Sequence, residues 1–484
     1  DSTGLVGGST ANVISQITEL VIGGGAEASG NGSTAVDLAL DGGELAAGVV
    51  VDLADSLIAS GDASRGMMLM STADASGSLS VDVGGSIGSL GVGATALSAS
   101  TIGNSSAGDI DVFAGGDVVA DGEGSTAVDL LSDASAAGSI AAKLGGTVMA
   151  SGHSATGVRA RTTGESAGRI AVDAGGSLAA SGDASVALDL ASTSIGGSAG
   201  EVTAQIGGSV WADAVAASGL RMVSDGETAS NHVAADIGGS LMTQGSGSQG
   251  LRLQSISGSG SAGDINLAVA DDVVTSGAGA TGAAVFSEGG TSGGSLALTL
   301  GADLVTMGTG ASGMIAASAG DLSAGDVVAT LAGAILSEGE QSSGLSLSSL
   351  SLAGDTGSVS ATVTGEASST GKDSIGLNLV SNAATNAGDV NLSVGGILTA
   401  SGEIARGASL RSSGGLTSGN VTFDVSGMTL GEGDGVTVIE LISTAARSAG
   451  DIFTTLGDTL FMSGQNSRGV ALTSSSEGVA GSVT

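Results

Sequence analysis

A single unit of about 31 residues recurs from one end of this chain to the other. Its best copies read D-[IV]-x-V-x-x-G-G-x-[VL]-x-A-S-G-x-x-x-x-G-[VL]-x-L, followed by a polar loop that usually ends in Ala-Gly. The copies begin at Ile17, Gly48, Ser78, Asp109, Ser139, Arg169, Glu201, His232, Asp264, Ser295, Asp326, Ser358, Asp389, Asn420 and Asp451, with a sixteenth started at Ser482. Every step between copies is 30 to 32 residues. Such regularity indicates that each copy is one structural unit stacked on the next.

Apolar residues alternate with other residues inside each copy. Counting positions from the start of a copy, positions 2, 4 and 6 are apolar in every copy, with Thr18 and Thr454 as the only exceptions. Positions 20 and 22 are apolar throughout. A period of two with β-branched residues is typical of half-buried strands. The clearest predicted core stripes are Ile265, Leu267, Val269, Val390, Leu392 and Val394.

Glycines recur between the predicted strands. Position 14 is Gly in 14 of the 15 copies, with Ala214 as the exception, position 19 is Gly in ten, and positions 7 and 8 are Gly-Gly in eight. Gly adopts positive φ without a steric penalty, so glycines at fixed offsets predict chain corners. The predicted structural corners include Gly30, Gly61, Gly152, Gly277, Gly402 and Gly464.

These patterns predict an all-β fold, a right-handed parallel β-helix (β-solenoid) of about 15 coils. Each coil has about 31 residues and three short strands, near positions 2–6, 9–13 and 20–24. We expect a single continuous array over 1–484, with partial coils at 1–16 and 482–484. At about 4.8 Å per coil it would form a rod of roughly 70 Å. The absence of Pro fits internal strands, where Pro would remove a ladder hydrogen bond. A larger β-roll, or a coil of half the repeat, is the alternative.

Charge and composition limit the possible partners. The chain has 12 Lys and Arg against 48 Asp and Glu, a formal net charge of −36. An acidic chain repels nucleic acids and anionic membranes, so we expect no nucleic-acid partner. No stretch approaches the roughly 20 apolar residues of a membrane span, so we expect no direct membrane insertion. The chain opens at Asp1 within repeat-like sequence and stops inside a repeat at Thr484, which indicates a segment of something longer.

Catalytic signals are sparse. His153 and His232 lie nearly three copies apart without a shared acidic cluster, and we interpret them as solvated surface residues. Trp211 and Phe461 fall at outward position 11 but eight copies apart, which favours isolated exposed aromatics over a local contact spot. The outward positions are interpreted as mixed Ser, Asp, Thr, Asn and Ala, which argues against the flat Thr array of an ice-binding face. We therefore predict no catalytic or cofactor-binding residues and no enzyme activity.

Calcium binding is a more specific functional alternative than catalysis. The nonapeptide whose Asp ladders bind Ca²⁺ in β-rolls does not occur. Position 1 alternates Asp with neutral polar residues in the last copies, which relieves repulsion between stacked carboxylates. A solvated acidic stripe is the favoured interpretation, with scattered Ca²⁺ as the alternative. The weak candidate ligands are Asp264, Asp326, Asp389 and Asp451.

The basic residues predict ion pairs between coils. Arg159, Arg221 and Arg252 share outward position 21 with Asp129 and Asp189 of other copies. Asp129 and Asp189 each lie one copy away from Arg159. We interpret these residues as devices that fix the register between coils, with each exposed pair contributing less than about 1 kcal/mol.

Several segments resemble a known repeat. Residues 395–402 (GGILTASG), 175–182 (GGSLAASG) and 466–470 (NSRGV) are similar to the G-G-x-[IV]-x-[TA]-S-G-x-x-[SA]-x-G-[IV] units in passenger regions of large Gram-negative autotransporter-type surface proteins. The resemblance covers essentially the whole chain and implies a secreted or outer-membrane-displayed β-helical stalk or adhesin. The family's translocating barrel and N-terminal signal are not found in these 484 residues, so export and anchoring follow from the resemblance alone.

The expected function is that of a non-enzymatic extracellular structural or adhesive rod, or of a fibre-forming surface protein. A polysaccharide-active β-helix enzyme and a phage-fibre-like binding protein are the alternatives. Expected partners are identical subunits or further coils stacked end to end, and a host, cell or matrix surface. Clustered outward carboxylates with Arg or aromatic residues on adjacent coils would favour the enzyme.

Overall fold

The computed structural model describes residues 3–13 and 18–484. The described residues form strands and turns and contain no helix. The chain divides into two compact units, Asp1–Gly238 and Gly239–Thr484, which are described separately. The expected single continuous array therefore stays a prediction.

Unit 1 has three parallel sheets, which we name by their order along a copy. Its first sheet comprises β2 (Thr18–Ile22), β5 (Val49–Leu53), β8 (Leu79–Val83), β11 (Ile110–Ala114), β14 (Ile140–Leu144), β17 (Ile170–Ala174), β20 (Val202–Ile206) and β23 (Val233–Ile237). Its second sheet comprises β3 (Ala26–Ala28), β6 (Leu57–Ala59), β9 (Ile87–Ser89), β12 (Val118–Ala120), β15 (Val148–Ala150), β18 (Leu178–Ala180) and β21 (Val210–Ala212). Its third sheet comprises β1 (Thr3–Val13), β4 (Thr34–Leu45), β7 (Arg65–Ala75), β10 (Thr95–Ser106), β13 (Thr126–Asp133), β16 (Thr156–Gly164), β19 (Val186–Ser194) and β22 (Ser218–Gly226).

Unit 2 repeats this arrangement. Its first sheet comprises β26 (Ile265–Val269), β29 (Leu296–Leu300), β33 (Val327–Leu331), β37 (Val359–Val363), β40 (Val390–Val394), β43 (Val421–Val425) and β46 (Ile452–Leu456). Its second sheet comprises β24 (Leu241–Thr243), β27 (Val273–Thr275), β30 (Leu304–Thr306), β34 (Ile335–Ser337), β38 (Ala367–Ser369), β41 (Leu398–Ser401), β44 (Thr429–Glu432) and β47 (Leu460–Ser463). Its third sheet comprises β25 (Gln249–Ser257), β28 (Thr281–Gly289), β31 (Ser312–Gly320), β35 (Ser343–Ser351), β39 (Ile375–Ala383), β42 (Arg406–Gly414), β45 (Thr437–Ala445) and β48 (Arg468–Ser476). Two short loop strands, β32 (Ser323–Ala324) and β36 (Asp355–Thr356), pair with each other.

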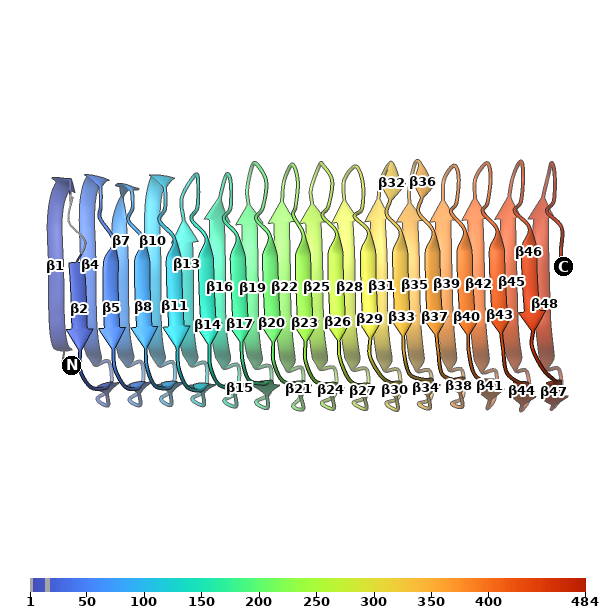
Figure 1. Cartoon of the computed structure of the whole chain (residues 1–484), viewed down its shortest axis with the longest axis horizontal. Helices are drawn as coiled ribbons and strands as arrows, with labels where there is room; N and C mark the ends of the chain where they lie inside the picture. Colours follow the sequence, from blue (N-terminus) through green and yellow to red (C-terminus); the bar gives the residue numbers. More distant parts are fainter. Residues whose placement is uncertain (1–2, 14–17) are drawn as a thin grey trace. The chain divides into compact units, whose positions relative to one another are not determined.

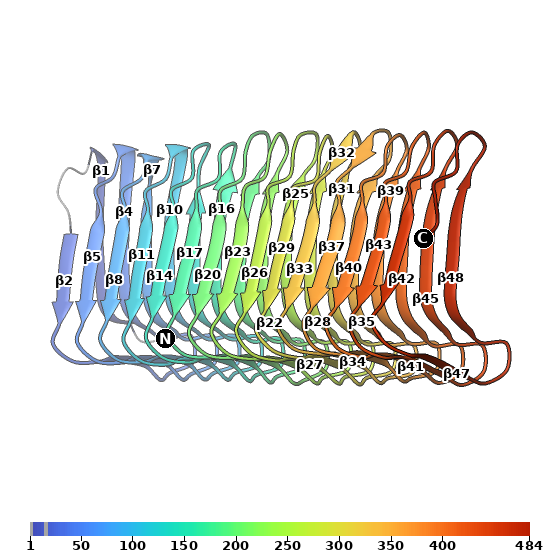
Figure 2. The same cartoon turned by 45° about the vertical axis from the view of Figure 1, so that its right-hand side comes forward.

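Each strand pairs in parallel with the strand one repeat away. In unit 1, Ile110 lies opposite Ile140 and Val112 opposite Ala142. Within each unit the strands of one sheet lie side by side, with the polar loops at one edge and the short second sheet at the other (Figures 1 and 2). One repeat is therefore one coil, as predicted, and the larger β-roll and half-repeat coil are wrong.

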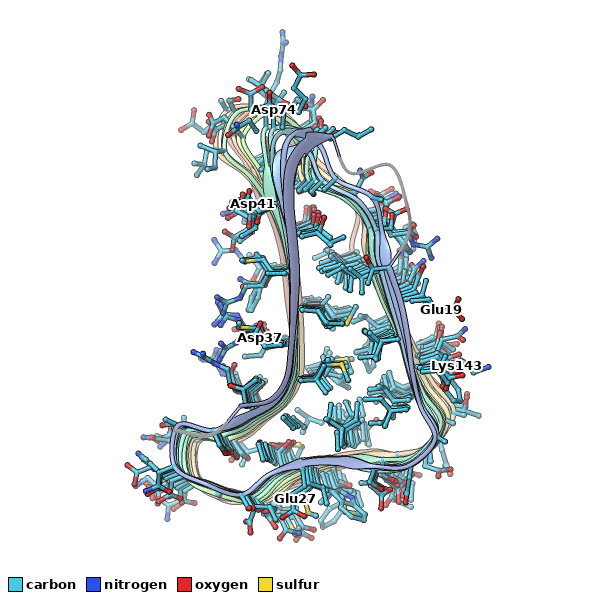
Figure 3. The ribbon with its side chains drawn as sticks, turned by 90° about the vertical axis from the view of Figure 1, so that its left-hand side faces the viewer. Glu19, Glu27, Asp37, Asp41, Asp74 and Lys143 are labelled. Atoms are coloured by element: carbon cyan, nitrogen blue, oxygen red, sulfur yellow. The ribbon has the colours of Figure 1, made fainter. Side chains whose placement is uncertain are left out.

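The coil is right-handed. Seen from the N-terminal end of unit 1, the chain runs down the side that carries Glu19, past Glu27, and up past Asp37 and Asp41 to Asp74 (Figure 3). This path is clockwise as the chain recedes, which is the predicted hand. All six labelled side chains point outward, while the unlabelled side chains inside the coil stack in rows (Figure 3).

The core is the thin space between the three sheets. The predicted stripes Ile265–Val269 and Val390–Val394 keep every inward side chain at 2% exposure or less. Phe423 is the largest fully buried side chain and lies between Leu392 and Thr454 in the register. Equivalent inward residues thus stack coil on coil, which is how Val, Ile, Leu and Ala fill the interior with few aromatics.

Two strand lengths differ from the prediction. The second strand is mostly three residues, positions 10–12, and the third usually covers positions 18–26 rather than 20–24, as β28 shows. Parallel pairing with the neighbouring coil extends the third strand through Gly and Ser residues that have little strand propensity. Tertiary pairing therefore sets these boundaries.

The left-handed backbone lies at position 16, two residues after the predicted corner. Position 16 has positive φ in all 15 copies, from +50° to +71°. Eight of these residues are not glycine, among them Ala184 and Ile404. At position 14, Gly402 and Gly464 have positive φ, but Gly61, Gly152 and Gly277 do not. The expectation that positive φ explains the position-14 glycines is thus wrong for those three.

Close packing between coils explains the position-14 glycines instead. A Cβ on Gly152 would lie 2.3 Å from the carbonyl oxygen of Gly122, and one on Gly277 would lie 2.1 Å from that of Gly245. These distances are far below contact, and the obstacle is backbone. The glycines therefore form a ladder in which each Cα faces the carbonyl of the preceding coil.

Candidate functional site

A row of buried hydroxyls runs along the coils, and several of its members link one coil to the next. Position 24 is Ser or Thr in 14 of 15 copies, Leu40 being the exception. In 13 of these copies the side chain is fully buried: Ser71, Thr101, Ser132, Thr162, Ser192, Ser224, Ser255, Ser287, Ser318, Ser349, Ser381, Ser412 and Ser443. Ser192 shows the arrangement, since its Oγ donates to Gly168 O of the preceding coil at 3.0 Å and accepts from Gly200 N at 2.8 Å. The sequence interpretation missed this row, although the recurrence of Ser and Thr at one inward position could have revealed it.

We expect Ser192→Ala to destabilise unit 1 by about 1–3 kcal/mol, because it leaves the buried Gly200 N–H without its partner. Gly168 O keeps the hydrogen bond that Thr162 Oγ1 donates. Ser132→Ala is the matched control, since Ser132 is equally buried and its Oγ has no hydrogen-bond partner. That control should be neutral within about 0.5 kcal/mol. Urea denaturation followed by circular dichroism measures both, and equal losses would contradict the role assigned to the row.

The four candidate calcium ligands occupy one outward row of unit 2. One oxygen of each accepts the backbone N–H of the next coil, as from Ser295 N to Asp264 at 2.7 Å and from Ser482 N to Asp451 at 2.6 Å. Asp326 and Asp389 make the same contact at 2.7 Å with Ser358 and Asn420. Among the described residues, no group of three or more His, Cys, Asp or Glu side chains is placed to hold a metal ion. Binding of scattered Ca²⁺ by this row stays a prediction.

Ion pairs connect coils on the outer face of the third sheet in unit 1. Asp129, Arg159, Asp189 and Arg221 lie opposite one another in successive coils. The expected Arg159–Asp129 pair is present at 4.0 Å. Asp189 pairs with Arg221 at 3.9 Å and with Arg161 at 3.4 Å. The alternation of sign keeps like charges apart along this row.

Two carboxyl groups, one at the end of β22 and one on the loop strand β36, have shifted pKa values. Burial, with the nearby negative charge of Glu227, raises the pKa of Asp225 in unit 1. In unit 2, hydrogen bonds from the side chains of Thr385 and Asn386 lower the pKa of Asp355. Asp355 lies on β36, so these bonds join two successive loops.

We expect the Asp355 contribution to loop stability to be present above the ordinary pKa of an Asp carboxyl, 3.8, and to be lost as pH falls through the lower folded value. A carboxyl-carbon NMR titration should give a midpoint below the ordinary value of 3.8 in the native chain. Thr385→Val should raise that midpoint, because the Thr385 hydrogen bond is the largest cause of the lowered pKa. A native midpoint at or above the ordinary value would contradict this assignment.

The remaining sequence candidates lie apart. Trp211 is 43% exposed on β21 of unit 1, and Phe461 is 50% exposed on β47 of unit 2. His153 is exposed in a turn of unit 1, and the backbone carbonyl of His232 accepts from Val202 N. A shallow recess among the unit 1 loops has Glu165 as its only titratable lining residue. None of these side chains forms a constellation for acid–base or nucleophilic chemistry.

One outward row differs from what the sequence predicts. Position 11 of the second sheet carries Ile, Val, Leu, Met, Phe or Trp in ten of 15 copies. The equivalent residues occur at only five of 30 outward positions of the first sheet (positions 3 and 5) and eight of 30 of the third (positions 21 and 23). The interpretation of uniformly mixed small polar residues is therefore wrong for the second sheet. Its three-residue strand has a single outward side chain per coil, which is too short for period-two analysis to reveal.

The fold defines a right-handed parallel β-solenoid whose inward residues repeat and whose outward residues vary. Searches against protein families, curated proteins and solved structures find no match to this chain. Within the described part of the chain, no helix is long and apolar enough to cross a bilayer.

Proposed function

We propose that this chain is a non-enzymatic structural or adhesive module that works outside the cell, as a surface rod or as part of a fibre. The main support for this proposal is the contrast between the inward and the outward residues of the coils. Inward positions 2, 4, 6, 20 and 22 stay almost entirely apolar from coil to coil. The outward acids that lie beside Arg residues, Asp129 and Asp189, are paired with them in ion pairs, and among the described residues no group of three or more His, Cys, Asp or Glu side chains is placed to hold a metal ion. The resemblance to autotransporter passenger repeats supports a secreted or outer-membrane-associated location.

Display on a non-adherent Gram-negative cell tests this function. We expect cells that carry the chain to adhere to matrix-coated surfaces or to link to one another more than cells carrying a β-solenoid of unrelated sequence. In parallel, the purified chain is incubated with anionic and neutral polysaccharides, and the release of reducing or unsaturated ends is followed. Depolymerisation without any gain in adhesion would replace the proposal with the polysaccharide-active alternative.

We also propose that identical subunits stack end to end, because the terminal coil of a β-solenoid has unpaired strand edges that invite a further strand. Sedimentation that shows a strict monomer at high concentration would contradict this self-stacking.

A further inference from the structure

The apolar stripe of the second sheet in unit 2 has the composition of a docking surface. Met242, Val274, Val305 and Leu336 are its four consecutive outward residues, and they lie directly opposite one another in register. Each is partly exposed, and Met307, two residues beyond Val305, is 46% exposed. Contiguous exposed apolar residues bordered by polar ones are typical of interaction sites.

The charged side chains at the positions that flank the stripe are acidic, and Lys372, at position 15 of the coil after Leu336, is paired with Glu403 at 3.0 Å. Eight copies have their second-sheet strand in unit 2, and positions 8 to 14 of these copies contain no Lys, Arg or His. Asp272 and Asp303 border the stripe at position 9, and Glu338 borders it at position 13. One oxygen of Asp272 accepts from Asp303 N at 3.0 Å, and one of Asp303 accepts from Ala334 N at 2.7 Å. These hydrogen bonds fix both carboxylates beside the apolar row.

The negative charge beside the stripe indicates which kind of partner can bind there. A second copy of this chain, with its own net charge of −36, would bring like charges together at the rim. A partner with apolar side chains at its centre and Lys or Arg around them would satisfy both features of the surface. We propose that the stripe binds a cationic amphipathic polypeptide segment. This inference is independent of where the protein works.

The test measures binding of labelled peptides to the full chain by fluorescence anisotropy. A peptide of alternating Leu and Lys should bind, while one of alternating Leu and Glu, or Ser and Lys, should bind at least about tenfold more weakly. Affinity for the Leu-Lys peptide should fall as NaCl rises from about 20 mM to about 500 mM, because salt screens the rim charges. Equal binding of the Leu-Glu peptide would overturn the proposal.

Two variants separate the apolar and charged contributions. The triple variant Val274→Thr, Val305→Thr, Leu336→Gln should lose about tenfold in affinity. The variant Asp272→Asn, Asp303→Asn, Glu338→Gln removes the three charges, and at positions 272 and 303 an amide oxygen can still accept from the backbone N–H of the next coil. This variant should lose most of the salt dependence.

The matched control changes three apolar residues on another outer face. Ile315→Thr, Val380→Thr, Ile442→Thr alters outward, partly exposed residues of the third sheet in unit 2 and should change affinity less than about twofold. Equal affinities of the stripe variant and this control would overturn the proposal. Native dimerisation in sedimentation that only the stripe variant abolishes would overturn it too, since the stripe would then serve self-association.

Discussion

Gly308→Ala is expected to destabilise unit 2 by more than about 3 kcal/mol, whereas Gly310→Ala, two residues later, should cost only about 1–2 kcal/mol. A Cβ on Gly308 would lie 2.2 Å from Gly277 O and 2.7 Å from its carbonyl carbon. Overpacking costs about 1–3 kcal/mol even where side chains can move, and here the obstacle is the backbone of a paired coil. The coils would have to separate locally to admit one methyl group.

Gly310→Ala is the control that separates the cost of a steric contact from the cost of a left-handed backbone conformation. Gly310 has φ of +64°, and a Cβ there meets nothing within 4 Å. Its cost is therefore the ordinary penalty of a left-handed L-residue, and Ala184 already occupies the same position in unit 1 at φ +54°. Urea denaturation or thermal melting of both variants measures the difference. A greater loss in Gly310→Ala would show that corner conformation, not the glycine ladder, limits the stack.

Phe423→Ala should destabilise unit 2 by about 3–5 kcal/mol, because it removes the largest fully buried side chain from the core between the three sheets. Phe453→Ala, on the adjacent strand β46, is the control. Phe453 is 41% exposed at an outward position, so its loss should cost less than about 1 kcal/mol. The two substitutions remove the same side-chain atoms, but Phe423 faces the core and Phe453 faces solvent.

Hydrogen exchange locates the effect of Phe423→Ala. In a stacked array each coil contacts mainly its neighbours, so exchange should quicken in Val390–Val394, Val421–Val425 and Ile452–Leu456. The strand Ile265–Val269 of the same unit should change far less. Uniform acceleration over unit 2 would contradict nearest-neighbour packing.

The sequence predicted the coil well because its signals are local and repeated. Alternation at positions 2, 4 and 6 identifies the inward face, and a constant 31-residue step identifies the neighbour of each strand. Residue type alone does not show why a given position requires glycine. Gly277 and Gly279 look alike in sequence, yet the first accommodates a carbonyl of the preceding coil and the second a left-handed turn.

The functional surfaces were harder to predict. The row of buried hydroxyls sits at an inward position, where period-two analysis expects apolar residues, so its members were not predicted to be partners of the glycines that end the polar loops, such as Gly168 and Gly200. The Asp129–Arg159 pair was predictable because both residues share one offset. The apolar stripe of the second sheet was not predictable, since one outward residue per coil forms a row only after the coils are stacked.

The register of successive coils is the central claim, and disulfide trapping tests it most directly in this chain without cysteines. Ala297 and Val328 lie opposite each other on adjacent strands and both face outward, whereas Ser360 lies one coil further from Ala297. Under mild oxidation, Ala297→Cys with Val328→Cys should cross-link rapidly and leave the fold intact, because neighbouring strands are about 4.8 Å apart. Ala297→Cys with Ser360→Cys, about 9.6 Å apart, should not cross-link in the folded chain. Equal cross-linking of the two pairs, or none of the first, would contradict one repeat per coil.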